Sequence, residues 1–406
     1  MRKIFEAYFM PIMVLIVVFL NEICSCLQII TGTIEGSIIT HRVAIVLATM
    51  TYLLLFYDLC RGKFCGKDFK VLVLLAVIAA LYAITPSFYS ETKPRHFSYL
   101  LVFISEAIPS AYIGVRASRG IKWENVNKLL PFFVLVSSLL IGTIGLKYAS
   151  IGERVGNDDS GLNYQSVSYF MAFGFSYSCY YSLIVEHTKP WFKSPIWILM
   201  LLNMLFCAMM CLVSGGRGAF VYIVVIASFL LYYYLKSSKK KRFRAIISVA
   251  IIIAVVVWMI GYFNVMESAG MLRVMDRLTE DDSRMWLYRR AYNAFLQSPI
   301  LGNGVGSVWW TVGFFCHNMF LDVLSETGIV GISIVLYIFG DTLIRLYKWS
   351  SKNRIFFLLI IIMSGALVRN MFSGYWVAAV KLFFICSFVY CIKAREVLIK
   401  KGFIKY

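Results

Sequence analysis

Residues 298–331 read SPILGNGVGSVWWTVGFFCHNMFLDVLSETGIVG, and this stretch decides the class of fold. A glycine-rich polar loop turns here into a long apolar run, and the pair His317-Asn318 stands at the junction. An α-helix needs about 20 apolar residues to cross the hydrocarbon core of a bilayer. We therefore predict that the chain re-enters a membrane after this pair, and that residues 264–316 form one large loop outside it.

The composition of the whole chain is that of a polytopic membrane protein. Of its 406 residues, 60% are hydrophobic and only 15% are charged, which is far from the balance of soluble domains. We expect one all-α integral membrane domain over residues 1–406, with short helices in the large loop. The apolar runs predict about twelve transmembrane helices, at residues 5–30, 38–60, 69–90, 97–115, 128–148, 163–186, 195–214, 217–236, 243–263, 319–347, 355–373 and 376–392.

The basic residues are distributed as a topology signal. The formal net charge is +19, but Lys and Arg gather in alternate loops, as the positive-inside rule requires. The densest cluster is the run from Lys236 to Arg244. This alternation predicts cytoplasmic N- and C-termini and an extracytoplasmic 264–316 loop, and it argues against a nucleic-acid partner.

Several charged residues fall within or at the ends of apolar runs, where an unpaired charge is costly. Arg217 stands between glycines at the outer end of a span, which favours a shaped site over an arginine that only reaches lipid headgroups. Arg369 also lies near the outer face, where a ligand contact and a structural role are both open. We expect Glu22, Glu106 and Lys381 to pair with one another or with the arginines.

Within the large loop, residues 284–297 predict an amphipathic helix that stops at Ser298-Pro299. Arg289 and Arg290 share one side of this helix, and Leu287 is on the other. We expect the helix to lie along the membrane interface with its arginines facing a cleft. The alternative is that these arginines only contact lipid headgroups.

His317 is the candidate for proton transfer, because histidine titrates near neutral pH. It follows the arginine-rich, glycine-rich loop and precedes Asn318, which could orient its ring or hold a sugar hydroxyl. Glu326 lies further along the same span and could support this arrangement from within the bundle.

These elements together resemble the O-antigen polymerase and ligase superfamily, which includes Wzy-type polymerases and lipid A-core ligases. The most specific element is the pattern His-Asn, Glu-Thr-Gly and Gly within residues 317–331. The other matching elements are Asn163-Tyr164-Gln165 at the start of a span, SGGRGA at 214–219, SRMW at 283–286 and SPILGNGVG at 298–306.

The resemblance implies a metal-independent membrane glycosyltransferase with a GT-C-like helical bundle and no cofactor. Its donor would be an undecaprenyl-diphosphate-linked glycan on the outer face of the bacterial cytoplasmic membrane. Its acceptor would be a second lipid-linked unit, with membrane lipids and a chain-length regulator protein as further partners. His317 would be the catalytic base. The candidate ligands of the donor diphosphate are Arg217, Arg284, Arg289 and Arg290, and the supporting or sugar-binding candidates are Arg154, Asn163, Asn318, Glu326 and Arg369.

Two alternatives to a polymerase of O-antigen or capsule remain at this stage. A ligase that transfers the glycan to lipid A-core shares the generic motifs, and between the two we favour the polymerase. A flippase for the same lipid-linked glycans has a similar number of spans. Transporters often have related halves and midplane sites, whereas this chain shows no internal repeat and gathers its distinctive charges near the outer face.

Overall fold

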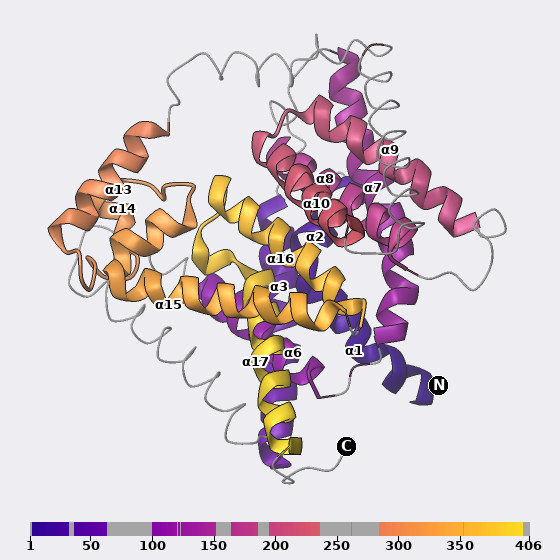
Figure 1. Ribbon diagram of the computed structural model, residues 1–406, viewed down its shortest axis with the longest axis horizontal. Coiled ribbons are helices and arrows are strands. Elements are labelled where there is room, and N and C mark those ends of the chain that lie inside the picture. The colour runs from indigo at the N-terminus through magenta and orange to yellow at the C-terminus, as the bar shows by residue number, and fades with distance from the viewer. Residues whose placement is uncertain are drawn as a thin grey trace.

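The structure is a computed structural model of the chain, and it describes residues 2–31, 36–62, 100–119, 121, 123–151, 164–185, 195–235, 261, 284–351 and 353–400. Within these ranges the regular elements are helices only (Figure 1). A backbone in lipid must satisfy its own hydrogen bonds, which an α-helix does within one segment. The elements are α1 (Arg2–Val18), α2 (Leu20–Thr31), α3 (Gly36–Cys60), the π-helical turn η3 (Phe103–Ala107), α6 (Ile108–Ala117), α7 (Trp123–Ile151), α8 (Tyr164–Leu183), α9 (Pro195–Ser214), α10 (Arg217–Leu235), α13 (Met285–Gln297), α14 (Val308–Thr311), α15 (Met319–Ser350), α16 (Ile355–Phe372), the 3-10 turn η6 (Trp376–Ala378) and α17 (Val380–Lys400).

The described part of the chain contains six helices that are long and apolar enough to cross a membrane, or seven if α1 and α2 form one bent span. This confirms a polytopic all-α membrane protein, while the number of twelve stays a prediction. Helices α8, α10 and α17 occupy three of the other expected spans but are not among the six. The expected spans 69–90 and 243–263 lie outside the described residues.

The first expected span, 5–30, is not one straight helix. Its halves α1 and α2 meet at Phe19 with a bend of 83°. The Phe19 ring packs between Phe133 and Phe173, at centroid distances of 5.1 and 5.0 Å. The bend places the first turn of α2, which carries Glu22, inside the helix bundle, where Glu22 is buried.

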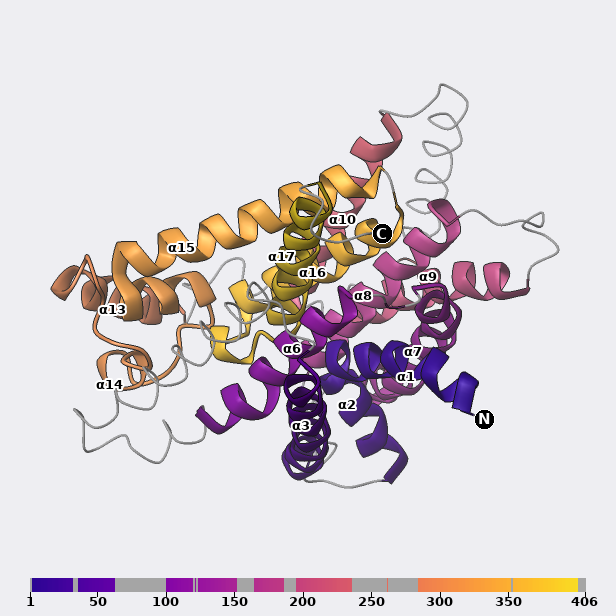
Figure 2. The ribbon, with the colours of Figure 1, turned by 90° about the horizontal axis from the view of Figure 1, so that it is seen from below.

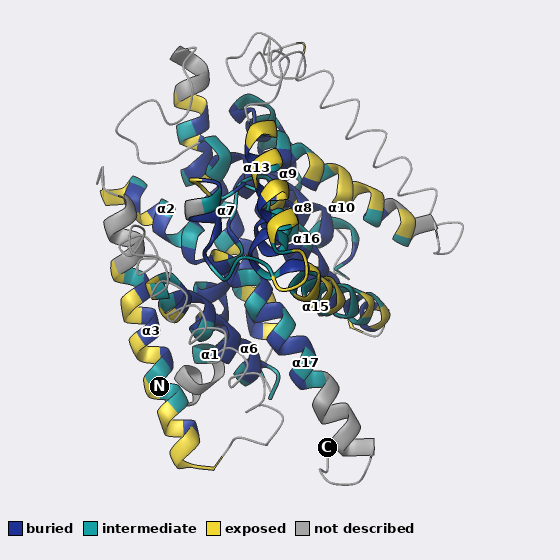
Figure 3. Cartoon of the chain, turned by 90° about the vertical axis from the view of Figure 1, so that its left-hand side faces the viewer, coloured by how far each residue is buried: buried dark blue, intermediate teal, exposed yellow. Residues whose placement is uncertain are grey.

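Helix α8 forms the centre of the bundle, and every residue from Val167 to Tyr180 is buried. It packs against α7, α9, α10 and α16. The outer faces of α3, α10 and α15 are exposed (Figure 3), and they present large apolar side chains such as Leu53, Val224 and Leu336. Apolar exposure of this kind fits helices that face lipid tails.

A second, smaller core holds the short helices of the large loop in place. Leu287 and Ala291 of α13 and Trp309 of α14 pack with Phe103 of η3 and Val377 of η6. The apolar side of α13, which the sequence pattern directs toward either protein or lipid, therefore faces protein. Figure 2 shows α13 and α14 at one end of the long helix α15, which then runs past α16 and α17.

The glycine-rich loop after α13 docks on a kink in α15. The kink is at Gly328, whose φ of 63° lies in the left-handed region that glycine adopts at little cost. The loop and the kink exchange backbone hydrogen bonds, from Ile329 N to Pro299 O (2.9 Å) and from Gly304 N to Glu326 O (2.9 Å). Asn303 extends this contact, because its Nδ2 donates to the Ala294 carbonyl at the end of α13 (2.7 Å). The loop therefore holds α13 against the first third of α15.

Candidate active site

His317 occupies the turn between the large loop and α15. Its φ of 56° makes it the one non-glycine residue with a left-handed backbone among those described, a conformation that costs about 1–3 kcal/mol and persists where surrounding packing holds it. The rings of Phe314 and Phe315 flank its imidazole, with centroid distances of 5.3 and 4.4 Å. Packing, rather than a loose loop, therefore fixes the direction of this side chain.

The surroundings of His317 favour its neutral form. Burial lowers the pKa of His317, the nearby Arg284 guanidinium lowers it further, and a hydrogen bond with the Ser373 backbone acts in the opposite direction. Its Nδ1 is buried and has no hydrogen-bond partner among the described residues. An imidazole that stays neutral near pH 7 and has an uncommitted nitrogen can act as a base.

Two side chains at the start of α15 fix the position of His317. The Asn318 Oδ1 accepts from the Phe320 and Leu321 amides at 3.1 and 3.3 Å, which caps the first turn of the helix. One turn later, Asp322 Oδ1 accepts from the Cys316 amide at 2.8 Å. Asn318 thus uses its oxygen for the helix rather than for the imidazole or a sugar.

Glu326 is fully buried and anchors the segment between α16 and α17. Its Oε1 accepts from the Tyr375 hydroxyl at 2.8 Å, and its Oε2 accepts from Trp376 Nε1 at 2.9 Å. Ser373, which contacts His317, stands two residues before Tyr375. Glu326 therefore fixes the segment that carries Ser373, the residue whose backbone contacts His317.

Arg217 and Arg284 line one cavity, which we call the arginine pocket. Its volume is about 210 Å³, and its walls include Tyr164, Tyr169, Arg217, Arg284, Tyr288 and Ser373. These residues come from the beginnings of α8, α10 and α13 and from the end of α16. Two arginines that are far apart in the sequence thus face the same space.

The turn between α9 and α10 places Arg217 at the first position of α10. The Gly216 amide donates to Ser168 Oγ at 3.0 Å, which ties this turn to α8. At Gly218 a Cβ atom would overlap the Tyr169 hydroxyl, so a larger residue there would displace the Tyr169 side chain from its present position. The amino end of α10 adds a positive partial charge to that of the guanidinium.

Arg284 stands immediately before α13, and its Nη1 donates to the Phe372 carbonyl at the end of α16. The other two arginines of this segment lie elsewhere. Arg289 and Arg290 are exposed and line neither of the cavities described here, and the Arg290 guanidinium lies over the Trp286 ring at 5.5 Å. The side of α13 that we expected to face a cleft is therefore exposed, and the arginine at its beginning faces one.

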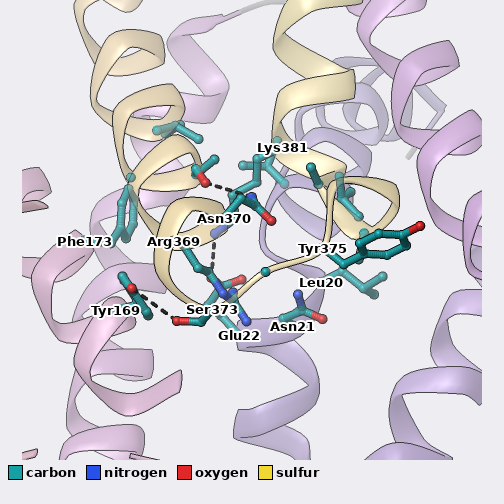
Figure 4. A pocket seen from close by; sticks show the side chains of 18 of the residues that line it. Leu20, Asn21, Glu22, Tyr169, Phe173, Arg369, Asn370, Ser373, Tyr375 and Lys381 are labelled. Atoms are coloured by element: carbon teal, nitrogen blue, oxygen red, sulfur yellow. Dashed lines mark hydrogen bonds and ion pairs between the residues drawn. The ribbon is translucent and has the colours of Figure 1, made fainter. Parts of the chain in front are cut away.

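A second cavity, of about 260 Å³, adjoins the arginine pocket, and Tyr169 and Ser373 line both (Figure 4). We call it the charged cavity, because Glu22, Arg369 and Lys381 line it. Lys381 Nζ lies 2.6 Å from Glu22 Oε1, so the expected pairing of these two residues is present. Glu106, which we also expected to pair, forms no ion pair with a described residue and is buried.

Sequence reasoning missed the contribution of Tyr169, Tyr288 and Ser373 to these cavities, since an isolated Tyr or Ser in an apolar helix carries no signal of a site. Arg154 and Asn163 lie outside the described residues. Among the residues that are described, no group of three or more His, Cys, Asp or Glu side chains is placed to hold a metal ion.

Comparison with known families agrees with the resemblance seen in the sequence. Residues 202–336, about a third of the chain, match a family model described as O-antigen ligase. The match includes the turn of Arg217, helix α13 and the His317 junction, and it supports membership of the O-antigen polymerase and ligase superfamily. Members of this family are glycosyl-transferring membrane enzymes. No curated protein sequence matches the chain significantly.

Proposed function

We propose that this protein is a glycosyltransferase that polymerises undecaprenyl-diphosphate-linked oligosaccharide repeat units into a surface polysaccharide. The observation that carries the proposal is the arginine pocket, which Arg217 and Arg284 both line. His317 lines neither cavity, but it contacts the backbone of Ser373 on the pocket wall and lies close enough to Arg284 for that guanidinium to lower its pKa. A diphosphate needs fixed cations with planar donor groups, and a sugar hydroxyl needs a base. The two arginines supply the cations, and His317, in contact with the Ser373 wall of the pocket, supplies the base.

The reaction follows from this arrangement. His317 accepts the proton of the acceptor hydroxyl as its oxygen forms a bond to the reducing-end anomeric carbon of the donor glycan. The bond from that carbon to the diphosphate oxygen breaks, and undecaprenyl diphosphate leaves with the electron pair. Arg217 and Arg284 stabilise the negative charge that develops on the leaving group, which is usually the largest catalytic contribution.

The site is on the extracytoplasmic face of the bacterial cytoplasmic membrane in this proposal, with both termini cytoplasmic. The loop charges support this orientation. The positive-inside rule also assigns an outer end to each of the helices α8, α10, α16 and α17. Four residues that line the cavities stand at these outer ends, namely Tyr164, Arg217, Phe372 and Lys381.

A ligase that uses a lipid A-core acceptor is the second candidate, and the description of the matching family model favours it. The two activities differ in the acceptor. A polymerase elongates, and therefore makes a series of products, whereas a ligase transfers the glycan to the core once.

The deciding experiment incubates the purified protein with lipid-linked repeat units, without nucleotide. We expect a ladder of glycans from the wild type and none from the His317→Ala variant. The matched control is Arg345→Gln, because Arg345 pairs with Asp341 away from both cavities (2.8 Å). A product that forms only when lipid A-core is added would replace polymerase with ligase, and transport of intact donor across vesicles without any new linkage would indicate a flippase.

A further inference from the structure

The charged cavity contains a carboxylate that is only half satisfied. Glu22 is 7% exposed and lines the cavity. Its Oε1 is bound by Lys381, but its Oε2 is buried and accepts no hydrogen bond from a described residue. An unsatisfied buried carboxylate oxygen is costly, and a ligand with a hydroxyl group would satisfy it.

Arg369 presents the complementary donor. It lines the same cavity and lies close enough to influence both Glu22 and Lys381 electrostatically. Within the described ranges no side chain forms a hydrogen bond or an ion pair with its guanidinium. Figure 4 draws Arg369 with Glu22, Ser373 and Lys381 around one space. Five N–H donors are thus available next to one free carboxylate oxygen.

The remaining walls of the cavity are largely apolar, and five of the lining side chains are aromatic. Tyr169, Phe173, Tyr222, Phe315 and Tyr375 line it. Apolar walls with a few convergent polar groups are the usual composition of small-molecule sites. A sugar ring fits this composition, because its C–H faces pack on aromatic rings while its hydroxyls both donate to a carboxylate and accept from a guanidinium.

The cavity also has the right neighbours for a reacting sugar. Ser373 and Tyr169 form its boundary with the arginine pocket. Phe315, on its wall, packs against the His317 imidazole at a centroid distance of 4.4 Å. A sugar in this cavity would therefore lie against Phe315, a ring that also contacts the His317 imidazole, and next to the pocket proposed for the donor diphosphate.

We infer that the charged cavity is the acceptor subsite, in which Glu22 and Arg369 bind the hydroxyls of the acceptor's terminal sugar. The inference rests on the proposed function, since it assigns the second substrate of that reaction. Lys381 holds the Glu22 carboxylate in place. The net charge of the three groups is +1, so a neutral or acidic sugar suits the site better than a basic one.

The test measures binding rather than turnover, so that it is independent of catalysis. The probes are undecaprenyl diphosphate and the lipid-free oligosaccharide released by mild acid from the host's own lipid-linked repeat units. The variants are Arg369→Gln and the double variant Glu22→Gln with Lys381→Gln, which removes the ion pair without leaving one charge alone. A third variant, Ala378→Leu, narrows the cavity at an exposed position without touching a charge.

We expect all three variants to weaken oligosaccharide binding at least about tenfold, since hydrogen bonds to charged groups contribute most to such affinities. Their affinity for undecaprenyl diphosphate should stay within about twofold of the wild type. Arg284→Gln should show the opposite pattern. The control is the double variant Asp341→Asn with Arg345→Gln, which removes an ion pair elsewhere (2.8 Å) and should change neither affinity.

Three outcomes would overturn the inference. They are unchanged oligosaccharide binding in folded variants, no oligosaccharide binding by the wild type, and a loss of undecaprenyl diphosphate binding in the cavity variants. The last would make the charged cavity part of the donor site. Failure of the proposed function has a different signature, namely no transfer product from wild-type protein that binds both probes.

Discussion

Two groups of arginines in this protein have different surroundings. At the ends of α3 and α6, Arg116 and Arg119 both face the buried Asp58, at 3.2 and 3.6 Å from its Oδ2. The Tyr112 hydroxyl donates to the same oxygen at 2.9 Å. Arg284 and Arg369 have no carboxylate within ion-pair distance among the described residues, and each lines a cavity.

The difference separates arginines that stabilise the fold from arginines that are available to a ligand. Asp58 also has one buried oxygen without a partner, as Glu22 has, so an unsatisfied atom alone does not mark a site. Asp58, however, lines neither of the two cavities. A cation next to a cavity and without a carboxylate is the combination that indicates binding of an anion or a hydroxyl group.

The largest expected effect is that of His317→Gln. The glutamine keeps a hydrogen-bonding side chain but cannot accept the proton, so the rate of transfer should fall about 100- to 10,000-fold. Binding of undecaprenyl diphosphate should persist, because the arginines remain. Single-turnover kinetics and a binding titration on the same preparation measure both quantities. Substantial transfer by the Gln variant would remove His317 from the role of base.

Arg→Lys substitutions test the arginine pocket next. Lysine keeps the charge and loses the planar pair of donors, so Arg217→Lys and Arg284→Lys should each lower the transfer rate about 10- to 100-fold. The matched control is Arg116→Lys, which should leave the rate unchanged within error. Normal rates in both pocket variants at normal expression would contradict diphosphate binding by these residues.

The third prediction concerns the dependence of the transfer rate on pH. Since burial and Arg284 lower the pKa of His317, its neutral form persists below the ordinary value, and activity should fall only below about pH 6. Replacement of Arg284 by Gln removes one cause of the lowered pKa and should move this acid limb to higher pH. Profiles of rate against pH for the two proteins provide the measurement. An acid limb that does not move would show that Arg284 has no electrostatic effect on the base.

Arg116→Gln should affect stability rather than the reaction. It removes one partner of a buried carboxylate while Arg119 remains, so we expect the free energy of unfolding to fall by about 1–3 kcal/mol. Thermal unfolding in detergent would record this loss, and the KM for the lipid-linked substrate should not change. A raised KM at unchanged stability would mean that Arg116 binds the substrate. The distinction between arginines that stabilise the fold and arginines that bind a ligand would then be wrong.

The smallest effect is expected for Arg289→Gln and Arg290→Gln, at most about threefold on the transfer rate. Both side chains are exposed, and exposed charges contribute little. An assay of each variant beside Arg284→Gln decides which arginine of this segment contacts the diphosphate. A loss as large as that of Arg284→Gln would mean that α13 turns when the donor binds.

Much of this arrangement could be predicted from the sequence, for identifiable reasons. Long apolar runs indicated the helices, and the cost of burying a charge predicted the pairing of Glu22 with Lys381. The motif around His317 and the glycines around Arg217 indicated the site. The pattern of α13 also separated its apolar face from its polar face, but it left open whether the apolar face meets protein or lipid.

Other features depend on contacts that are distant in the sequence. The sequence has no proline or glycine at Phe19 that would predict the bend between α1 and α2. The choice of Arg284 over Arg289 and Arg290 depends on where the beginning of α13 docks, and the glycine-rich loop on α15 sets that position. The second cavity, likewise, exists only because α2, α16 and α17 converge.

The contact between the glycine-rich loop and the kink of α15 has a consequence for sequence variation. It is made largely by backbone atoms, and at Gly302 and Gly328 a Cβ would collide with the opposite backbone. Ile300 and Leu301, in the same loop, are 66% and 72% exposed. Homologous enzymes can therefore replace most side chains of this loop while the spacing of the two glycines stays the same. Substitutions at the loop's exposed residues then leave its contact with α15 intact.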